Sequence, residues 1–363
     1  MDAIDVLIKY WGHTQFRLKQ QEIIKQVIDK KDTLALLPTG GGKSICYQVP
    51  ALMQEGICLV ISPLIALMDD QVRFLKSKGI KSIAITSGMH YNEIDTALTN
   101  CIYGGVKFLY LSPERLQNEL VQTRIKEMNI NLITVDEAHC ISEWGHNFRP
   151  AYRHISEIRE IIPDTPVLAL SATATSSVID DIQNNLNFKE HNLIQSSFTR
   201  ENLSYVVDNV EDKKSRLLKL VDKIKSSVII YVGSRKAAKE ITNFLLNNNY
   251  SANYYHGGLA AKVRTERQES WTQNQTRIMV ATNAFGMGID KPDVKLVVHL
   301  ELPSTIEAYF QEAGRAGRDG KQAYAFLLAN KGDVKKQQDL LTLRYPSISE
   351  IKTVYQNLAN YFQ

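Results

Sequence analysis

The sequence is poor in cysteine and lacks any long hydrophobic run. Its four cysteines stand at positions 46, 58, 101 and 140, and no two of them form a C-x-x-C pair. This spacing favours buried, reduced thiols over a zinc site or a set of disulfides, so no zinc is expected. No apolar run approaches the roughly 18 residues of a membrane helix, and the acidic N-terminus is unlike a signal peptide. We therefore expect a cytoplasmic protein, associated with the nucleoid if bacterial, with no membrane partner.

A large excess of charge of either sign is also absent. The chain has 43 Lys and Arg residues against 39 Asp and Glu residues, a formal charge of +4. This balance permits a nucleic-acid partner without arguing for one, because a groove can be basic on a nearly neutral protein. With 363 residues, of which 44% are hydrophobic and 23% charged, the chain has the size and composition of a soluble protein of two domains.

Short apolar runs recur along the chain, and each is followed by a segment of helical length. Their even hydrophobicity, as in "ICLVI", "NLITV" and "SVIIYV", favours strands that are covered on both faces. A polar stretch that begins at His191 interrupts the series. We therefore predict two α/β domains, residues 1–196 and 197–335, each a mostly parallel sheet with helices on both faces. Helical patterns over residues 336–363 predict a tail with which a longer C-terminal region would begin.

The stretch "LPTGGGKS" lies between a predicted strand and a predicted helix. Consecutive glycines let backbone N–H groups turn inward around phosphate oxygens at the start of a helix. Lys43 would reach the β- and γ-phosphates of a nucleotide, and Ser44 would offer its hydroxyl to Mg²⁺. Leu37 occupies the position where the strict motif has its first glycine, so a glycine-rich turn without a ligand is the alternative. The predicted phosphate-binding residues are Thr39, Gly40, Gly41, Gly42, Lys43 and Ser44.

Two adjacent acids, Asp136 and Glu137, follow the predicted strand "NLITV". The first can hold Mg²⁺, and the second can orient and deprotonate the attacking water. Taken alone, such a pair could equally be the acids of a helix N-terminus. With a phosphate loop upstream, the pair predicts Asp136 as a magnesium ligand and Glu137 as a catalytic residue.

In the second half, "YFQEAGRAGRDG" places Arg315 and Arg318 three residues apart. If this stretch is helical, both guanidinium groups project from one face. Arginines supplied across a cleft stabilise the charge of a phosphoryl-transfer transition state. A solvated basic helix end is the alternative, but glycines at 314, 317 and 320 favour a close backbone approach. We therefore predict hydrolysis at the interface of the two domains.

The stretch "DEAHCISEWGHNFRP" continues from the two acids into a different kind of sequence. Trp144, His146, Phe148 and Arg149 follow the acids, interspersed with small and polar residues. An enzyme that only hydrolysed nucleotide would have no need of these side chains there. Core packing of Trp144 and Phe148 is the alternative, and their polar neighbours fit it poorly.

Taken in order, these motifs resemble those of the RecQ family of DNA helicases in superfamily 2. The resemblance runs from about Trp11 to Gly320 and includes "WGHTQFRLKQQEII", "VISPLIALMDDQV", "LYLSPERL", "LALSATAT" and "VATNAFGMGIDKPDVKLVVH". It implies two tandem RecA-like domains, with ATP and Mg²⁺ as cofactors. Val232 and Gly233 depart from the larger or polar residues of many relatives, and the family's usual zinc module and winged helix do not occur in this sequence.

The resemblance implies roles for residues around the nucleotide. Gln20 is expected to read the edge of the adenine, with Arg17 beside it and His13 stacking where the family often has tyrosine. Gln311 and Asp290 are expected on the nucleotide side or in coupling.

The aromatic stretch is similar to the aromatic-rich loop of the family. Bases of single-stranded DNA stack on aromatic faces, at ~1–3 kcal/mol per base, and Arg149 would bind phosphate or stack. Because this loop leaves the turn that carries the two acids, DNA bound there would control hydrolysis. His139, Ser171 and Thr173 would relay between the two sites, although His139 could equally be a structural histidine.

The family likeness extends the DNA path to further residues that follow strands. They are Ser62, Pro63, Ser234, Arg235, His256, Thr282 and Asn283. The hydroxyl groups among them could instead cap helices.

The predicted function is that of a monomeric 3′→5′ DNA helicase and translocase core in which single-stranded DNA stimulates ATP hydrolysis. Its partners would be single-stranded DNA and duplex DNA with a 3′ tail. Two alternatives stay open, an RNA-directed ATPase of the same superfamily and a fragment that binds DNA and ATP without unwinding.

Overall fold

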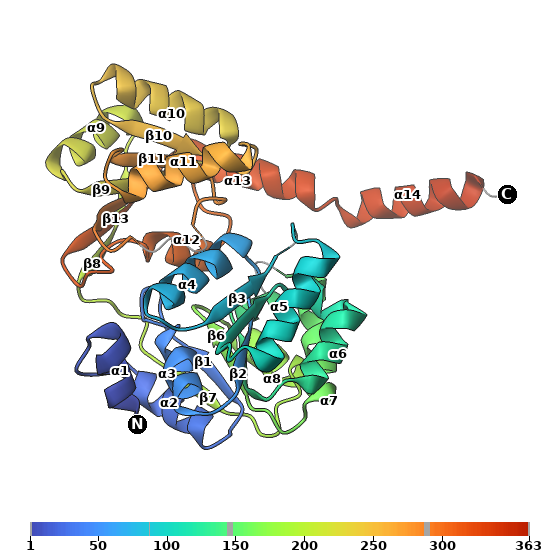
Figure 1. Ribbon diagram of the computed structural model, residues 1–363. Helices are drawn as coiled ribbons and strands as arrows, with labels where there is room; N and C mark the ends of the chain where they lie inside the picture. Colours follow the sequence, from blue (N-terminus) through green and yellow to red (C-terminus); the bar gives the residue numbers. More distant parts are fainter. Residues whose placement is uncertain (1, 87, 144–147, 287–290, 362–363) are drawn as a thin grey trace. The chain divides into compact units, whose positions relative to one another are not determined.

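Figure 1 shows the computed structural model, which describes residues 2–86, 88–143, 148–286 and 291–361. The chain forms two compact units. The main part of the first ends at Arg200, and the second consists of Glu201–Phe285 and the chain from Lys291 onward. Within the described residues, no helix is long and apolar enough to cross a membrane.

The first unit contains a seven-stranded sheet in the order β3-β4-β2-β5-β6-β1-β7. All neighbouring strands in it are parallel. The strands are β1 (Thr33–Leu36), β2 (Ile57–Ile61), β3 (Ser82–Ile85), β4 (Phe108–Leu111), β5 (Ile130–Val135), β6 (Val167–Ser171) and β7 (Leu193–Gln195). Because β1, β5 and β6 are consecutive neighbours, the segments that leave their carboxyl ends meet at one edge.

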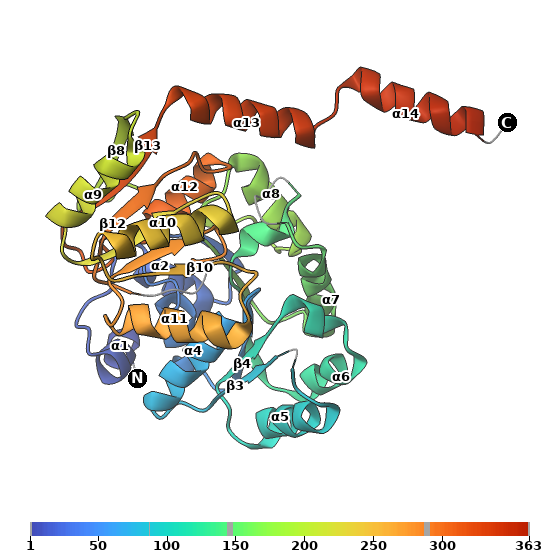
Figure 2. The same cartoon turned by 90° about the horizontal axis from the view of Figure 1, so that it is seen from above.

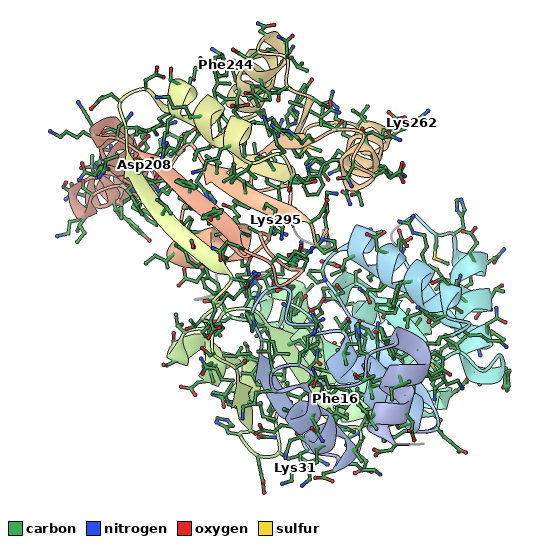
Figure 3. The ribbon with its side chains drawn as sticks, turned by 90° about the vertical axis from the view of Figure 1, so that its left-hand side faces the viewer. Phe16, Lys31, Asp208, Phe244, Lys262 and Lys295 are labelled. Carbon is green, nitrogen blue, oxygen red and sulfur yellow. The ribbon has the colours of Figure 1, made fainter. Side chains whose placement is uncertain are left out.

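Both faces of this sheet are covered, as the alternation along β1 shows. Leu34 and Leu36 belong to one hydrophobic cluster, and Ala35 and Leu37 belong to another. The first cluster is completed by α5 (Tyr91–Tyr103), α6 (Glu119–Glu127), α7 (Ile155–Ile161) and α8 (Ser176–Asn185). The second is completed by α2 (Gln20–Ile28), α3 (Ile45–Met53) and α4 (Ile65–Ser77). The N-terminal α1 (Ala3–Trp11) packs on α2 and α3 together with Phe16, which Figure 3 labels.

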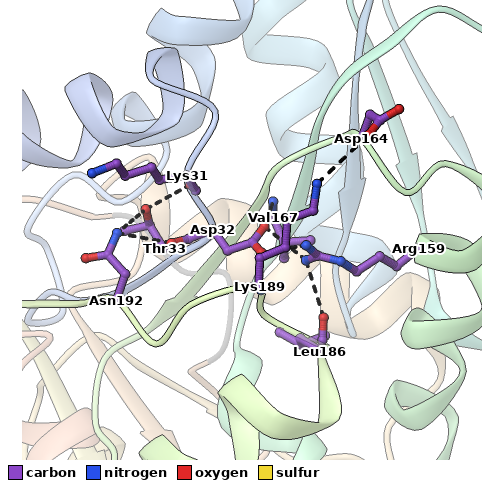
Figure 4. A network of polar contacts seen from close by, with 9 residues as sticks. All are labelled: Lys31, Asp32, Thr33, Arg159, Asp164, Val167, Leu186, Lys189 and Asn192. Atoms are coloured by element: carbon purple, nitrogen blue, oxygen red, sulfur yellow. Dashed lines mark hydrogen bonds and ion pairs between the residues drawn. The ribbon is translucent and has the colours of Figure 1, made fainter.

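An ion pair ties this sheet together at its amino edge (Figure 4). Asp32 and Arg159 are each 6% exposed. The Asp32 carboxylate accepts from Arg159 Nη1 at 3.0 Å, from Val167 N at 3.0 Å and from Lys189 N at 2.8 Å. One carboxylate thereby joins the starts of β1 and β6 to α7 and to the segment that follows α8.

The second unit contains a six-stranded sheet in the order β10-β11-β9-β12-β13-β8, again with parallel neighbours throughout. Its strands are β8 (Leu203–Asn209), β9 (Ser227–Tyr231), β10 (Ala252–Tyr255), β11 (Ile278–Ala281), β12 (Val294–His299) and β13 (Ala323–Ala329). Its helices are α9 (Lys213–Lys223), α10 (Arg235–Asn247), α11 (Ala261–Thr272) and α12 (Ile306–Ala313).

The hydrophobic residues of this sheet also divide between two faces. Val228 and Ile230 of β9 form one cluster with α9 and α10. The intervening Ile229 is fully buried, and so is Trp271 of α11, whose ring packs edge-on against Phe285 at 5.4 Å. The prediction of two α/β domains, each a mostly parallel sheet with helices on both faces, is confirmed.

Two further helices follow β13 (Figure 2). They are α13 (Lys331–Arg344) and α14 (Ile348–Tyr361). None of the residues of α14 is buried, and Ile348, Tyr355 and Tyr361 are among its most exposed side chains.

Candidate nucleotide and nucleic-acid site

The glycine-rich loop lies between β1 and α3, as the sequence predicts. Gly40 and Gly42 have φ values of 80° and 71°, a left-handed backbone that favours glycine. Ser44 stands at the N-terminal end of α3. The loop therefore presents its backbone at the positive end of a helix, which is the arrangement that binds anions.

The side chain of Gln20 holds this loop through hydrogen bonds. Its Nε2 donates to the carbonyl oxygens of Gly41 and Gly42 at 3.1 and 3.0 Å, and its Oε1 accepts from Arg17 N at 2.8 Å. A Cβ atom added at Gly42 would lie 2.5 Å from Gln20 Nε2, so the contact needs glycine there. His13 and Arg17 are exposed beside it. The sequence pointed to Gln20 only as a reader of adenine, and the contact with the loop was not foreseen, because it depends on where α2 meets α3.

The two acids lie opposite the loop lysine. Asp136 follows β5 directly and its N–H donates to Ile61 O of β2 at 2.9 Å. Lys43 Nζ lies 3.8 Å from Glu137 Oε1, and both side chains are 18% exposed. Glu137 has φ 48° and ψ 46°, and a non-glycine residue adopts this left-handed conformation only at an energetic cost. Such strain is typical of positions that the surrounding structure holds for chemistry.

The carboxylate of Asp136 is held in an unusual electrostatic setting. Burial, and next the charge of Glu137, raise its pKa to about 6, although the charge of Lys43 acts in the opposite direction. A cation bound nearby would stabilise the charged form of such a carboxylate. The hydroxyl of Thr39 is buried and has no hydrogen-bond partner among the described residues. An acid that needs a cation, an unpaired hydroxyl and a glycine cradle fit a triphosphate with Mg²⁺, for which Ser44 and Asp136 are the candidate ligands.

The three residues predicted to couple the sites lie together. His139 Nδ1 is 3.1 Å from Ser171 Oγ, and Ser171 Oγ donates to Thr173 O at 2.9 Å. His139 Nδ1 is also 3.4 Å from Glu137 Oε2. A chain of contacts therefore runs from the second acid to the carboxyl end of β6.

The aromatic stretch is described only in part. Trp144 and His146 lie outside the described residues, as does Asp290. Phe148 is half-buried, with the guanidinium of Arg153 over its ring at 5.2 Å.

Arg149 joins three loops of the first unit. Its Nη1 donates to Pro63 O at 3.0 Å and lies 3.9 Å from Glu114 Oε1. Pro63 follows β2 and Glu114 follows β4, so Arg149 ties the segment after β5 to the loops of the next two strands in the sheet. Glu114 was not predicted as a site residue, although it lies in the quoted motif "LYLSPERL".

Three neighbouring strands of the second unit carry the residues predicted for its DNA path. Ser234 and Arg235 follow β9, His256 follows β10, and Thr282 and Asn283 follow β11. The order β10-β11-β9 brings these residues to one edge of the sheet. Ser234 caps α10 by accepting from Ala237 N at 3.1 Å, so the capping role considered for these hydroxyl groups is present at this position.

His256 lies in a basic setting at this edge. Its ring stacks on Tyr254 at 5.6 Å. Burial and the charge of Arg235 lower its pKa, so the imidazole is neutral at physiological pH.

The segment with the two arginines is not helical. The condition under which both guanidinium groups would project from one helix face is therefore not met. The helix α12 contains Gln311 and ends at Ala313, and Arg315 and Arg318 lie in successive turns. Beyond the helix, the chain is held at Gly317, which has φ 67°, donates to Val294 O at 2.8 Å and accepts from Asn202 Nδ2 at 2.7 Å through its carbonyl. Arg315 is only 8% exposed.

The glycine at 317 is required by the packing around it. An added Cβ atom would approach Asn202 Nδ2 to 2.6 Å. Beyond it, Asp319 pairs with Lys295, labelled in Figure 3, at 2.6 Å. The close backbone approach that the glycines indicated is therefore present at Gly317, whereas an added Cβ atom at Gly320 would meet nothing within 4 Å.

Comparisons with known proteins agree with this arrangement. A family model for DEAD/DEAH box helicases matches residues 17–182, and one for the helicase conserved C-terminal domain matches residues 212–320. The fold is similar to that of the DEAD-box helicase Mss116 bound to ssRNA and UDP-BeF, with a TM-score of 0.76 at 19% identity over 94% of this chain and 75% of that one. Fold and motifs together define a helicase of the DEAD/DEAH box class with two α/β domains.

The relatives in sequence narrow this class. The chain is 42% identical over 352 residues to the probable ATP-dependent DNA helicase RecS of Bacillus subtilis (strain 168), covering 96% of this chain and 71% of that protein. It is 43% identical over 342 residues to the ATP-dependent DNA helicase RecQ of the same organism, covering 93% of this chain and 58% of that protein. The chain belongs to the RecQ family of DNA helicases.

Proposed function

We propose that this chain is an ATP-driven DNA motor that moves 3′→5′ and hydrolyses ATP faster when single-stranded DNA is bound. The observation that carries the proposal is Arg149, which joins the segment leaving Asp136 and Glu137 to the loops after β2 and β4. The names of the relatives RecS and RecQ, both ATP-dependent DNA helicases, support DNA as the substrate.

The nucleotide is assigned to the loop after β1. Thr39 to Ser44 bind its phosphates, Ser44 and Asp136 hold its Mg²⁺, and Glu137 orients and deprotonates the attacking water. Bound Mg²⁺ neutralises charge that develops on the phosphates. Lys43, now 3.8 Å from Glu137, binds a phosphate oxygen, which leaves the glutamate able to accept a proton. Gln20 holds the loop in shape and reads the edge of the adenine, with Arg17 beside it and His13 stacking on the base.

DNA is assigned to the adjoining loops of the first domain. Ser62, Pro63, Phe148 and Arg149, with Trp144 and His146, contact phosphates and bases. Tyr152 links this surface to the acids, because it follows Arg149 closely in the chain and its O–H donates to Asp136 O at 2.9 Å. Tyr152 is fully buried, so a shift of the segment 148–152 moves the backbone of Asp136 with it. His139, Ser171 and Thr173 pass the shift to β6.

The second domain completes the motor. Ser234, Arg235, His256, Thr282 and Asn283 grip the DNA backbone, and Gln311, Arg315, Arg318 and Asp290 act on the nucleotide when the domains close. We assign residues 1–196 to the first domain, 197–335 to the second and 336–363 to a tail. The motor works as a monomer in the cytoplasm, on single strands and on duplexes with a 3′ tail.

A single set of measurements tests the proposal. ATP hydrolysis is followed without nucleic acid, with a single-stranded DNA oligonucleotide and with RNA of the same sequence, using Lys43→Ala as the inactive control. Stimulation by DNA and weaker stimulation by RNA is expected, and it should decline as salt rises because phosphate contacts dominate. Equal or greater stimulation by RNA would favour the RNA-directed ATPase, and no stimulation would reject the coupling.

Direction is tested on two duplexes that differ only in their tail. A duplex with a 3′ tail should be separated in the presence of ATP, and one with a 5′ tail should not. ATP hydrolysis without separation of either duplex would identify a fragment that binds DNA and ATP without unwinding.

A further inference from the structure

A carboxylate of the second unit lies between α13 and the turn that carries two of the predicted DNA contacts. Glu301 follows β12 by two residues, and its side chain is 24% exposed. Its Oε1 accepts from Gly233 N at 3.0 Å, and its Oε2 pairs with Lys336 Nζ of α13. Gly233 directly precedes Ser234 and Arg235. Glu301 therefore joins α13 to the turn that follows β9.

The carboxylate occupies the space that a side chain at position 233 would take. A Cβ atom added at Gly233 would lie 2.8 Å from Glu301 Oε2 and 3.2 Å from its Oε1. Gly233 is also one of the two positions where the sequence departs from the larger or polar residues of many relatives. The hydrogen bond from the backbone of Gly233 is thus possible because this residue has no side chain.

The start of α13 is fixed at the same place by a second set of contacts. Lys213 Nζ of α9 donates to Leu300 O and to Asp333 Oδ2, both at 2.6 Å. The side chains of Lys213 and Asp333 are 15% and 12% exposed, and Asp333 Oδ2 also accepts from Asn330 N at 2.7 Å as part of the capping box of α13. Such charge-assisted hydrogen bonds are strong. The first turn of α13 is therefore held on the residue that precedes Glu301.

An acid at a surface that binds phosphates would by itself repel DNA. The pairing with Lys336 offsets this charge, and the hydrogen bond from Gly233 N fixes the backbone from which the next two side chains project. Ser234 caps α10 from this turn. The guanidinium of Arg235 lies against Gly258, where an added Cβ atom would come within 2.5 Å of its Nη1. The position of the turn therefore sets where both side chains can meet a phosphate.

We propose that Glu301 is a positioning residue that holds the turn Gly233–Arg235 in the conformation that grips the DNA backbone, and that Lys336 fixes Glu301 from α13. This inference rests on the proposed function, which assigns Ser234 and Arg235 to DNA. It gives α13, which follows the last strand of the sheet, a part in the strength of DNA binding.

Two variants of Glu301 separate positioning from charge. Glu301→Ala removes the acceptor together with the charge, and Glu301→Gln keeps an oxygen that accepts from Gly233 N. With saturating ATP, Glu301→Ala should raise the single-stranded DNA concentration at half-stimulation of hydrolysis about fivefold, and Glu301→Gln should raise it less than about twofold. The DNA-free rate and the rate in saturating DNA should stay within about twofold in both.

Two other outcomes overturn the positioning role. Tighter DNA binding by both variants would show that Glu301 acts only as a repelling charge, and an equal rise in both would show that the hydrogen bond does not hold the turn. The control is Glu240→Ala on α10, where Glu240 pairs with Lys236 at 3.9 Å and is 59% exposed. It should stay within about twofold. A fivefold rise there would show that the effect is not specific to Glu301.

The link to α13 is tested with two neighbouring lysines. Lys336→Ala should raise the DNA concentration at half-stimulation about threefold, and Lys335→Ala, which removes the same charge, less than about twofold. In the double variant Glu301→Ala/Lys336→Ala the rise should equal that of Glu301→Ala alone. Effects that multiply would show that Lys336 contacts DNA directly, and they would overturn the part assigned to α13.

Arg235→Ala separates this inference from the proposed function. Weakened DNA stimulation in Arg235→Ala beside an unchanged Glu301→Ala overturns the positioning role and leaves the proposed function intact. Unchanged DNA stimulation in Arg235→Ala overturns the assignment of DNA to this turn. A rise in the DNA concentration at half-stimulation in both variants supports the inference and the function on which it rests.

Discussion

The two edges of the first sheet each hold a carboxylate, and the two carboxylates differ in whether other groups of the chain neutralise their charge. At the amino edge, Asp32 is paired with a guanidinium and with two backbone N–H groups. At the carboxyl edge, Asp136 lies beside a second acid, and burial and that acid raise its pKa to about 6. The first edge satisfies its charge within the chain, and the second leaves a charge that a bound cation would satisfy. The amino edge of the sheet therefore contributes to stability, and the carboxyl edge carries the candidate catalytic site.

The largest effect is expected at the carboxyl edge, from Glu137→Gln. Glutamine keeps the size of the side chain and cannot take a proton from water. We expect kcat for ATP hydrolysis to fall more than about 1,000-fold while ATP is still bound. Hydrolysis in saturating single-stranded DNA and equilibrium binding of a fluorescent ATP analogue measure the two effects. Undiminished turnover would show that another group is the base.

The next largest effect is expected at the amino edge, from Asp32→Asn. The change leaves Arg159 buried without its counter-charge, at a cost of about 3 kcal/mol in the free energy of unfolding of the first unit. Urea unfolding, followed by a signal from that unit, measures it. The control is Asp95→Asn, since Asp95 pairs with Arg124 on the surface at 2.9 Å and its loss should cost less than about 1 kcal/mol. Equal costs for both variants would mean that the edge is not stabilised by the buried pair.

A smaller effect of opposite sign is expected from Asp136→Asn in the absence of magnesium. Because the pKa of Asp136 is raised in the folded protein, from 3.8 to about 6, its favourable contribution is present below pH 3.8 and is lost as the pH rises to about 6. Above that pH the variant should therefore be more stable than the unmodified protein. The side chain keeps some exposure to solvent, so we expect a gain of about 1 kcal/mol.

Melting curves from pH 5 to pH 8 test this prediction. The gain should grow up to about pH 6 and then stay constant. Addition of Mg²⁺ with a nucleotide should remove it, because only the aspartate binds the metal tightly. A variant that is less stable at pH 8 would show that the carboxylate is not under electrostatic stress.

The sequence predicted the carboxyl edge well, because its residues occur in contiguous motifs after apolar runs. The phosphate loop, the two acids and the residues His139 and Ser171 each lie in such a motif, and the fold brings them together at this edge. The condition that the arginine segment is helical is not met. The contact between Gly317 and Asn202, which holds this segment, joins positions that are far apart in the sequence and so leaves no local pattern.

The pairs that stabilise the two sheets were not predicted at all. Asp32 and Arg159 are separated by 127 positions, and neither lies in a motif. The stack of Tyr231 on His299 depends on two strands that only the sheet order makes neighbours. Sequence motifs indicate site residues that lie close together in the chain. Pairs that are distant in the chain depend on the strand order, which the motifs do not contain.

The smallest effect is expected from Arg149→Lys, at the link between the acids and the outer loops. Lysine keeps the charge but loses the fork of donors that lets arginine reach Pro63 O at 3.0 Å and Glu114 at 3.9 Å. We expect the DNA concentration at half-stimulation of hydrolysis to rise about threefold, with little change in the DNA-free rate. Arg124→Lys, the same change on α6, is the control and should leave both values as they are. A change in the DNA-free rate instead would show that Arg149 acts on the acids whether or not DNA is bound. The difference between the amino edge, whose charge is paired within the chain, and the carboxyl edge, whose charge needs a ligand, would then need another explanation.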